Sequence, residues 1–287
     1  MRLPPFLLPF SSCLLTSVLS ANPTLSQQRP LATEDPEPIG SVRILIEAGV
    51  DFARDQHYPV SGLSGNLLKA PTIGLSFGLS SIAELQIDGA VYQRLDIAER
   101  RPTAPLASLL TVTGNYTSDV DDIVVATKIR LVPEGPGRPA VGIRFATKLP
   151  DASNENGLGL DTTDFYGSLL GAKTVQSVRL VVNLGGAILA DPTVGNRQND
   201  VLTYGVSLAR ALTEGAEVVG EFNGRVSTRT GEAFPGSESR SLLKFGARYT
   251  RGTVRVDAGV FFGLTRLDPT IGFTAGGTFV FNAFRVP

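Results

Sequence analysis

The chain of 287 residues has 26 basic and 27 acidic residues, a net charge of -1, so no basic excess points to a nucleic-acid partner. Its one cysteine, Cys13, excludes an intramolecular disulfide and a cysteine metal cluster, and its one histidine, His57, excludes a multi-histidine metal site. The 31 glycines suit a chain of tight turns and closely packed strands.

The first residues predict a secretory signal peptide over 1–21. Arg2 supplies a positive start, an apolar stretch runs over 3–19, and Ser20-Ala21 offers a small-residue cleavage site. A transmembrane helix fits less well, because the run is short and three early prolines break its first turns. We place Cys13 inside the signal rather than at the start of a lipoprotein. Residues 22–40 mix four prolines with charged side chains and predict an extended periplasmic lead-in to one domain over 41–287.

From Ser41 onward a single pattern repeats, in which apolar side chains alternate with polar or charged ones. This two-residue period is that of a β-strand with one apolar face and one polar face. We count twelve such segments, each long enough to cross a bilayer when tilted. In chain order they are 42–52, 72–79, 84–96, 122–131, 141–149, 164–169, 178–188, 202–208, 217–226, 240–249, 254–262 and 271–282.

The connections between these segments alternate between long and short. Long polar loops are expected at 55–66, 97–118, 151–161, 191–199 and 228–238, whereas Ser80-Ser81 and Arg251-Gly252 are tight turns. Outer-membrane barrels have short periplasmic turns, longer outside loops and an even strand number. Closure of such a barrel also leaves no unpaired backbone edge in lipid. A soluble sandwich or lipocalin-like barrel is the alternative, but it seldom repeats this alternation in every strand.

We therefore predict an all-β protein, a transmembrane antiparallel up-and-down β-barrel of about 12 strands that follows a cleaved signal peptide. Its expected place is the outer membrane of a Gram-negative-type bacterium. The expected partners are outer-membrane lipid, small-molecule solutes and, during biogenesis, the outer-membrane assembly machinery. In the hairpin over 138–173 we expect Val141, Ile143, Phe145, Phe165 and Leu169 to face lipid.

The polar faces of the strands predict a charged lumen. Either these side chains pair across neighbouring strands and close the lumen, or they form a weak filter with a modest preference for anions. Twelve strands lie between the eight-stranded barrels that side chains fill and the larger barrels that hold water channels. We expect Arg94 and Asp96 on the polar face as well. The predicted lumen-facing charged residues are Arg43, Glu47, Glu84, Asp88, Lys128, Arg130, Arg144, Lys148, Asp164, Arg179, Glu217, Glu221, Arg240, Lys244, Arg248, Arg255 and Asp257.

Two candidate sites are weighed and set aside. His57 lies beside Ser61 in the first outside loop, but a catalytic base needs a nucleophile within hydrogen-bond reach, and a lone loop histidine is typical of a solvated surface. The loop over 151–161 is rich in oxygen ligands, yet its spacing does not match the twelve-residue calcium loop. We predict that the protein is not an enzyme, and we predict no catalytic residue, metal or cofactor.

The hairpin over 142–173 resembles the bacterial outer-membrane MetA-pathway of phenol degradation family. In that family a strand ends in Lys-Leu-Pro, a glycine-rich loop follows, and Thr-Asp opens the next strand. Lys148-Leu149-Pro150, Gly157-Leu158-Gly159 and Thr163-Asp164 fill those places here, although Pro150-Asp151-Ala152 departs from the family's Pro-Thr-Gly. The resemblance implies a transporter-like barrel that passes small hydrophobic or aromatic compounds, and it implies no catalytic residues.

The predicted function is a passive channel for small solutes in the outer membrane. The alternative is a closed structural or adhesion-type barrel that acts through its extracellular loops. Steady ion current across a planar bilayer distinguishes the two, because only an open lumen conducts.

Overall fold

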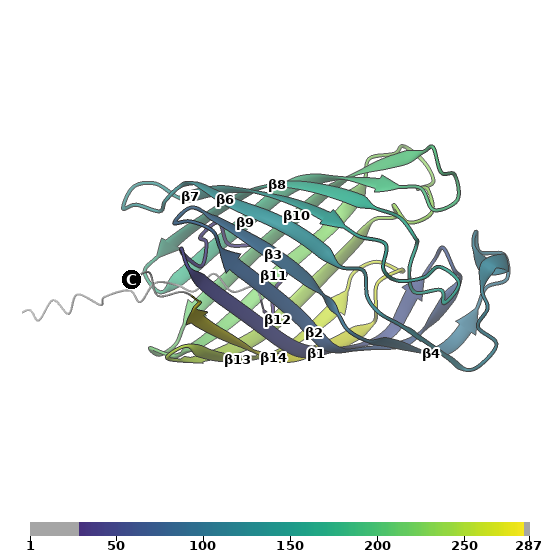
Figure 1. The fold of residues 1–287 in the computed structure, drawn as a ribbon, viewed down its shortest axis with the longest axis horizontal. Coiled ribbons are helices and arrows are strands. Elements are labelled where there is room, and N and C mark those ends of the chain that lie inside the picture. The colour runs from purple at the N-terminus through teal and green to yellow at the C-terminus, as the bar shows by residue number, and fades with distance from the viewer. Residues whose placement is uncertain (1–28, 284–287) are drawn as a thin grey trace, which may run out of the picture.

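A computed structural model describes residues 29–283 of the protein, and the predicted signal peptide over 1–21 lies outside the described residues. Fourteen strand segments of the described part form one antiparallel sheet that closes on itself. The closing strand is β1 (Arg43–Tyr58), which pairs with β2 (Leu63–Gly78) on one side and with β14 (Ile271–Asn282) on the other. The tilted strands wrap into a barrel with longer loops at one end (Figure 1).

Four short segments make up two of the strands of the barrel wall. Both β3 (Ala83–Ala90) and β4 (Gln93–Arg100) pair with β2, one after the other along its length. In the same way β5 (Tyr116–Asp119) pairs with β4, and β6 (Val124–Val132) pairs with β3. The wall formed by the described residues is therefore a closed barrel of twelve antiparallel strands, which confirms the predicted fold class.

The remaining strands pair in sequence order from β6 to β14. They are β7 (Ala140–Lys148), β8 (Asp164–Val175), β9 (Val178–Ala190), β10 (Gln198–Ala211), β11 (Ala216–Ser227), β12 (Arg240–Arg251) and β13 (Val254–Gly263).

Long and short connections alternate around the barrel, and two of the predicted loops are shorter than expected by several residues. The loop expected at 55–66 shrinks to 59–62, because β1 and β2 continue their pairing to Tyr58 and Leu63. The loop expected at 97–118 shrinks to 101–115 and contains one 3-10 turn, η1 (Ala107–Leu109). Polar residues therefore extend these strands beyond the apolar pattern, since backbone pairing can continue where no lipid contact requires an apolar face. No helix of the described residues is long and apolar enough to cross a membrane.

The outer face of the barrel carries the apolar side chains. Phe145, Phe165 and Leu169 are exposed on it, whereas Val141 and Ile143 are half-buried among their neighbours on the same face. Exposed large apolar side chains recur on every strand from β8 to β14. Such a band cannot face water over so large an area in a stable monomer, so it is the lipid-facing surface.

One strand changes face part of the way along, and here the predicted orientation is wrong. Arg94 and Asp96 lie on the outside, where they pair with each other at 2.9 Å, while Leu95 is fully buried on the inside. The change occurs in the break between Ala90 and Gln93, opposite a matching irregularity at 70–71 in β2. Because side chains alternate with a period of two, an interruption of this kind exchanges the inner and outer faces.

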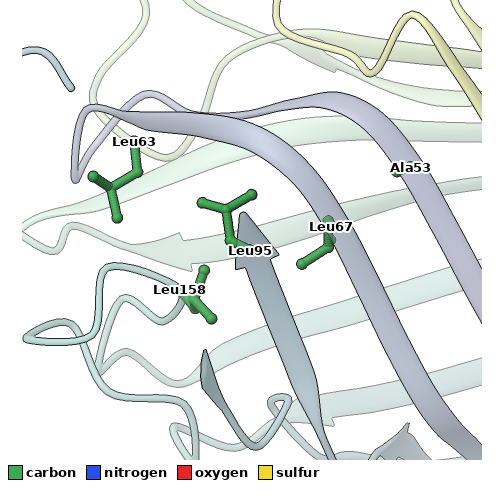
Figure 2. Packing of buried hydrophobic residues seen from close by; sticks show 5 residues of the cluster. All are labelled: Ala53, Leu63, Leu67, Leu95 and Leu158. Atoms are coloured by element: carbon green, nitrogen blue, oxygen red, sulfur yellow. The ribbon is translucent and has the colours of Figure 1, made fainter. Parts of the chain in front are cut away.

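Beyond this break an apolar cluster lies inside the long-loop end of the barrel. It consists of Ala53, Leu63, Leu67, Leu95 and Leu158 (Figure 2). Leu158 comes from the loop between β7 and β8, so this loop folds inward over the barrel wall. The outer end of the lumen is therefore partly closed by apolar packing, whereas its middle is charged.

We expect Leu169→Arg to destabilise the barrel by about 2–4 kcal/mol, the cost of a basic side chain at the centre of the lipid-facing band. Leu169 faces Ile143 and Leu184 across the neighbouring strands, far from either end. Denaturant unfolding of the protein in phospholipid vesicles measures the effect. Val194→Arg, in an exposed loop, is the control and should leave the unfolding midpoint nearly unchanged. Equal effects of the two substitutions would contradict a lipid-facing Leu169.

The face change in β4 gives a second expectation. Leu95→Ala should cost about 2–5 kcal/mol, because it leaves a cavity in the apolar cluster. Asp96→Ala should change the free energy of unfolding by less than about 0.5 kcal/mol, since Asp96 is exposed on the outside. The same unfolding experiment compares the two variants. A larger loss of stability for Asp96→Ala than for Leu95→Ala would contradict the exchange of faces, because it would place Asp96 inside the barrel and Leu95 outside.

Candidate functional site

The lumen of the barrel is occupied by residues 29–40. The amino-acid sequence predicts an extended periplasmic lead-in over 22–40. In the structure its described part instead contacts inward-facing side chains on all sides of the wall, from Thr72 on β2 to Glu221 on β11 and Thr274 on β14. The segment forms neither helix nor strand, and its three prolines suit an extended chain without ladder pairing.

Arg29 anchors the inner end of this segment. Its guanidinium donates hydrogen bonds to the hydroxyls of Thr72 at 2.9 Å and Thr274 at 2.8 Å. It also lies 3.7 Å from Asp51 and 3.5 Å from Asp257, whose side chain is fully buried. One arginine therefore bridges β1, β2, β13 and β14, the strands at which the barrel closes.

The middle of the segment is held through its backbone. The amide of Ala32 donates to both carboxylate oxygens of Glu221, at 2.9 and 3.0 Å, and the amide and hydroxyl of Thr33 donate to the same side chain. The amide of Glu34 donates to Asn183 at 2.7 Å, and Asn183 donates back to the Glu34 carbonyl at 2.8 Å. These contacts satisfy buried backbone groups that have no strand partner.

The absence of a side chain at Gly205 on β10 leaves space for the Thr33 side chain of the segment. A Cβ atom at this position would lie 2.7 Å from the Thr33 hydroxyl and 3.4 Å from the Thr33 Cβ. Gly205 is buried on the inner face, where a larger side chain would clash with the side chain of Thr33 as long as that threonine is present.

Three carboxylates of the segment neutralise cations of the lumen. Glu34 lies 3.3 Å from Lys128 and 3.2 Å from Arg144, and Asp35 accepts a hydrogen bond from Arg179 at 2.7 Å. Glu37 forms an ion pair with Arg130. These four cations are therefore paired with carboxylates of the segment.

Lys128 is the most deeply buried of these cations. Its side chain is fully buried between Glu34 and Glu84, whose carboxylate lies 2.9 Å from the ammonium. Glu84 also accepts the amide hydrogen of Ile39 at 2.6 Å. A buried charge is tolerated where opposite charges and hydrogen bonds surround it, so removal of one partner is costly.

The other predicted lumen residues also meet inside the barrel. Lys148 bridges Asp122 and Asp164 at 3.0 Å each, and Lys244 lies 3.7 Å from Glu221. Facing positions on adjacent strands supply several of these pairs, which is the cross-strand pairing considered in the sequence analysis. The remaining contacts join Arg43 to the Ile39 carbonyl, Glu47 to Thr278, Asp88 to Arg144, Glu217 to Arg248 and Arg255, Arg240 to Asp268, and Asp257 to Arg29.

The side chains do not fill the lumen. A cavity of about 740 Å³ lies against β1, β2 and β10 to β14, and a second of about 460 Å³ lies against β1 to β3 and β6 to β8. Arg29 and Leu31 line both cavities, so the segment forms part of the boundary between them. A third cavity of about 220 Å³ lies near His57 and the loop over 151–161. The two larger volumes are those of small-molecule sites, and such cavities hold water when polar groups line them.

His57 lines the smallest cavity together with Ser61, but the two residues are not paired. The Ser61 hydroxyl donates to the Gly157 carbonyl at 2.8 Å. Within residues 29–283 the His57 imidazole has no hydrogen-bond partner, and only its backbone carbonyl accepts, from Gln56 and Arg240. The residues therefore lack the base-to-nucleophile contact of an activated hydroxyl.

The loop over 151–161 uses its carboxylates to bind backbone amides, one within the loop and one in the chain just before β6. Asp151 accepts the amide hydrogen of Ile123 at 3.2 Å, and Asp161 accepts that of Asn154 at 3.1 Å. In the described part of the chain no three or more histidine, cysteine or acidic residues group together as a metal site would require. Hydrogen bonds of this kind are typical of an ordered polar turn.

Comparison with known proteins identifies the fold. No family model matches the sequence, and no curated protein matches it. The crystal structure of the COG4313 outer membrane channel from Pseudomonas putida F1 superposes with a TM-score of 0.60 at 13% identity, over 86% of this chain and 98% of that one. The NanC porin superposes with a TM-score of 0.50 at 9% identity, over 82% and 98%. The protein has the fold of these outer-membrane barrels.

Proposed function

We propose that the protein is a passive channel for small solutes in the outer membrane of a Gram-negative-type bacterium. The observation that carries the proposal is a charged lumen that keeps about 740 and 460 Å³ of free volume beside the segment over 29–40. A barrel that served only as a scaffold would gain stability by filling this space. The fold shared with the COG4313 channel and the NanC porin supports the same conclusion.

The resemblance of the hairpin over 142–173 to the MetA-pathway of phenol degradation family extends the proposal to hydrophobic or aromatic solutes. Lys148-Leu149-Pro150 and Thr163-Asp164 carry this resemblance. The 740 Å³ cavity adds support, because Leu67, Leu242 and Phe261 line it together with charged groups. Outer-membrane lipid surrounds the barrel in this proposal, and the outer-membrane assembly machinery inserts it. We assign it no enzymatic activity.

A closed structural or adhesion-type barrel is the second candidate. It is favoured by the number of contacts that hold the segment over 29–40, which joins strands on all sides of the lumen. The two functions differ in ion conduction, since a lumen sealed by this segment carries no current.

Single-channel recording in planar bilayers tests the channel. We expect steady ion current from the folded full chain, with folding verified by heat-modifiable migration in gels. Silence from correctly folded protein would overturn the channel and favour the closed barrel. Hydrolysis of phospholipid by the protein, abolished by His57→Ala, would overturn its non-enzymatic assignment.

Conductance should rise when the lumen segment is released. The triple variant Glu34→Gln, Asp35→Asn, Glu37→Gln removes the carboxylates that pair with four lumen cations. We expect a several-fold larger single-channel conductance, because the segment leaves its place and the freed cations face water.

A disulfide supplies the matched control for this variant. Thr33→Cys with Gly205→Cys places two thiols where the Cβ atoms lie about 3.4 Å apart, close to the distance that a disulfide requires. Added to the triple variant, the oxidised pair should return the conductance to the wild-type level, and reduction should raise it again. Conductance that does not respond to the disulfide would show that the segment does not limit the pore.

A further inference from the structure

The two larger cavities of the lumen differ in charge. Five cations and two carboxylates line the 740 Å³ cavity, whereas three cations and five carboxylates line the 460 Å³ cavity. Arg29, Asp51 and Lys69 border both and do not account for the difference. The lumen is therefore positive on the side of β11 and β12 and negative on the side of β3 and β6.

The positive side depends on Arg225 and Arg240. These arginines occupy directly opposed positions on β11 and β12, and both point into the lumen. Like charges at opposed positions repel each other, so this pair opposes folding unless another group compensates. The opposed pairs further along the same strands, such as Glu221 and Lys244, combine opposite charges.

Backbone carbonyls hold these guanidinium groups in place. Arg225 donates to the carbonyls of Gly236 at 2.8 Å and Glu238 at 3.0 Å. Arg240 donates to the carbonyls of Leu267 and His57. Within the described residues, no carboxylate lies within ion-pair distance of Arg225.

The nearest carboxylate to Arg240 is already engaged. Asp268 accepts the amide hydrogens of Ser241 and Thr265 at 3.0 Å each and the Thr265 hydroxyl hydrogen at 2.8 Å, while Arg240 lies 3.8 Å from its other oxygen. Both arginines are thus ordered, and the described residues give Arg225 no ion pair and Arg240 only this long one. Ordered guanidinium groups of this kind bind carboxylates through paired hydrogen bonds.

Apolar surface lies beside these cations in the same cavity. Leu242 is two residues from Arg240 on the inner face of β12, and Phe261 on β13 packs against the apolar cluster of the outer lumen. The Phe261 ring covers Gly272, where a Cβ atom would lie 2.0 Å from it, so the ring rests against the wall. Leu67 faces the same space from β2.

We infer that the 740 Å³ cavity binds a small organic carboxylate with an aromatic or apolar body. The carboxylate is held by Arg225 and Arg240, and the body lies on Leu242, Phe261 and Leu67. The volume is within the range of small-molecule sites. The acidic cavity on the other side repels an organic carboxylate, so such a ligand collects in the 740 Å³ cavity. We expect that cavity to bind an organic anion most tightly, its neutral analogue less tightly and an organic cation least tightly. This inference rests on the proposed channel, because it names the class of solute.

Calorimetric titration of the full chain in lipid nanodiscs tests the site without relying on conduction. The probes are benzoate, its neutral analogue benzyl alcohol, its cationic analogue benzylamine, and acetate, which has the charge without the ring. We expect benzoate to bind at least about tenfold more tightly than each of the other three, a difference of about 1.4 kcal/mol. Equal affinities for benzoate and benzyl alcohol would overturn the role of charge, and equal affinities for benzoate and acetate would overturn the role of the apolar body.

The double variant Arg225→Gln, Arg240→Gln should lose this preference for benzoate. Arg94→Gln is the matched control, since Arg94 lies at the same end of the barrel but on its outer face, and it should bind benzoate like the wild type. Arg225→Lys with Arg240→Lys keeps the charges and should retain part of the preference, which separates binding from misfolding. Undiminished benzoate binding by the Gln variant would overturn the site.

The two proposals fail in different ways. Benzoate binding in nanodiscs together with silence in planar bilayers would overturn the channel and leave the site in place. Ion conduction together with no preference for benzoate would overturn the site and leave the channel in place.

Discussion

The requirement that no backbone hydrogen-bonding group be left unpaired in lipid determines the architecture of this protein. It is met where β1 pairs with β14, so that the sheet has no edge. Closure in turn divides every strand into a lipid-facing side and a lumen side. Where the wall faces lipid, charged side chains can then be placed only in the lumen, and the twelve strands bring so many of them together that they must be paired or hydrated.

The segment over 29–40 meets part of this demand. It brings Glu34, Asp35 and Glu37 to cations on β6, β7 and β9. Its backbone amides donate hydrogen bonds to the carboxylates of Glu221 and Glu84 on the wall. The wall and the segment are thus mutually dependent, because each leaves buried charges unpaired without the other. Toward β11 and β12 this neutralisation is incomplete, and there the lumen keeps both free volume and excess positive charge.

Much of the barrel wall could be predicted from the chain alone, because the two-residue period reports directly which side chains share a face. Phe145, Phe165 and Leu169 lie outside as expected. The prediction was wrong for Arg94 and Asp96, since the break at 91–92 exchanges the faces and such an irregularity leaves the local pattern unchanged. The position of the segment over 29–40 was also not foreseen. Proline-rich residues without periodicity indicate only an extended chain, and its three clustered carboxylates were the one available signal.

The amino-acid sequence by itself determined the class of fold, the number of strands and the division of each strand into apolar and charged faces. These properties follow from local alternation and from turn residues, which act over a few positions. Only the tertiary structure decided which charges meet. The register of β11 and β12 places Arg225 opposite Arg240, and Lys128 contacts Glu34, which lies 94 residues away in the chain. Such contacts depend on how the sheet curves and closes, and no pattern of short range contains that information.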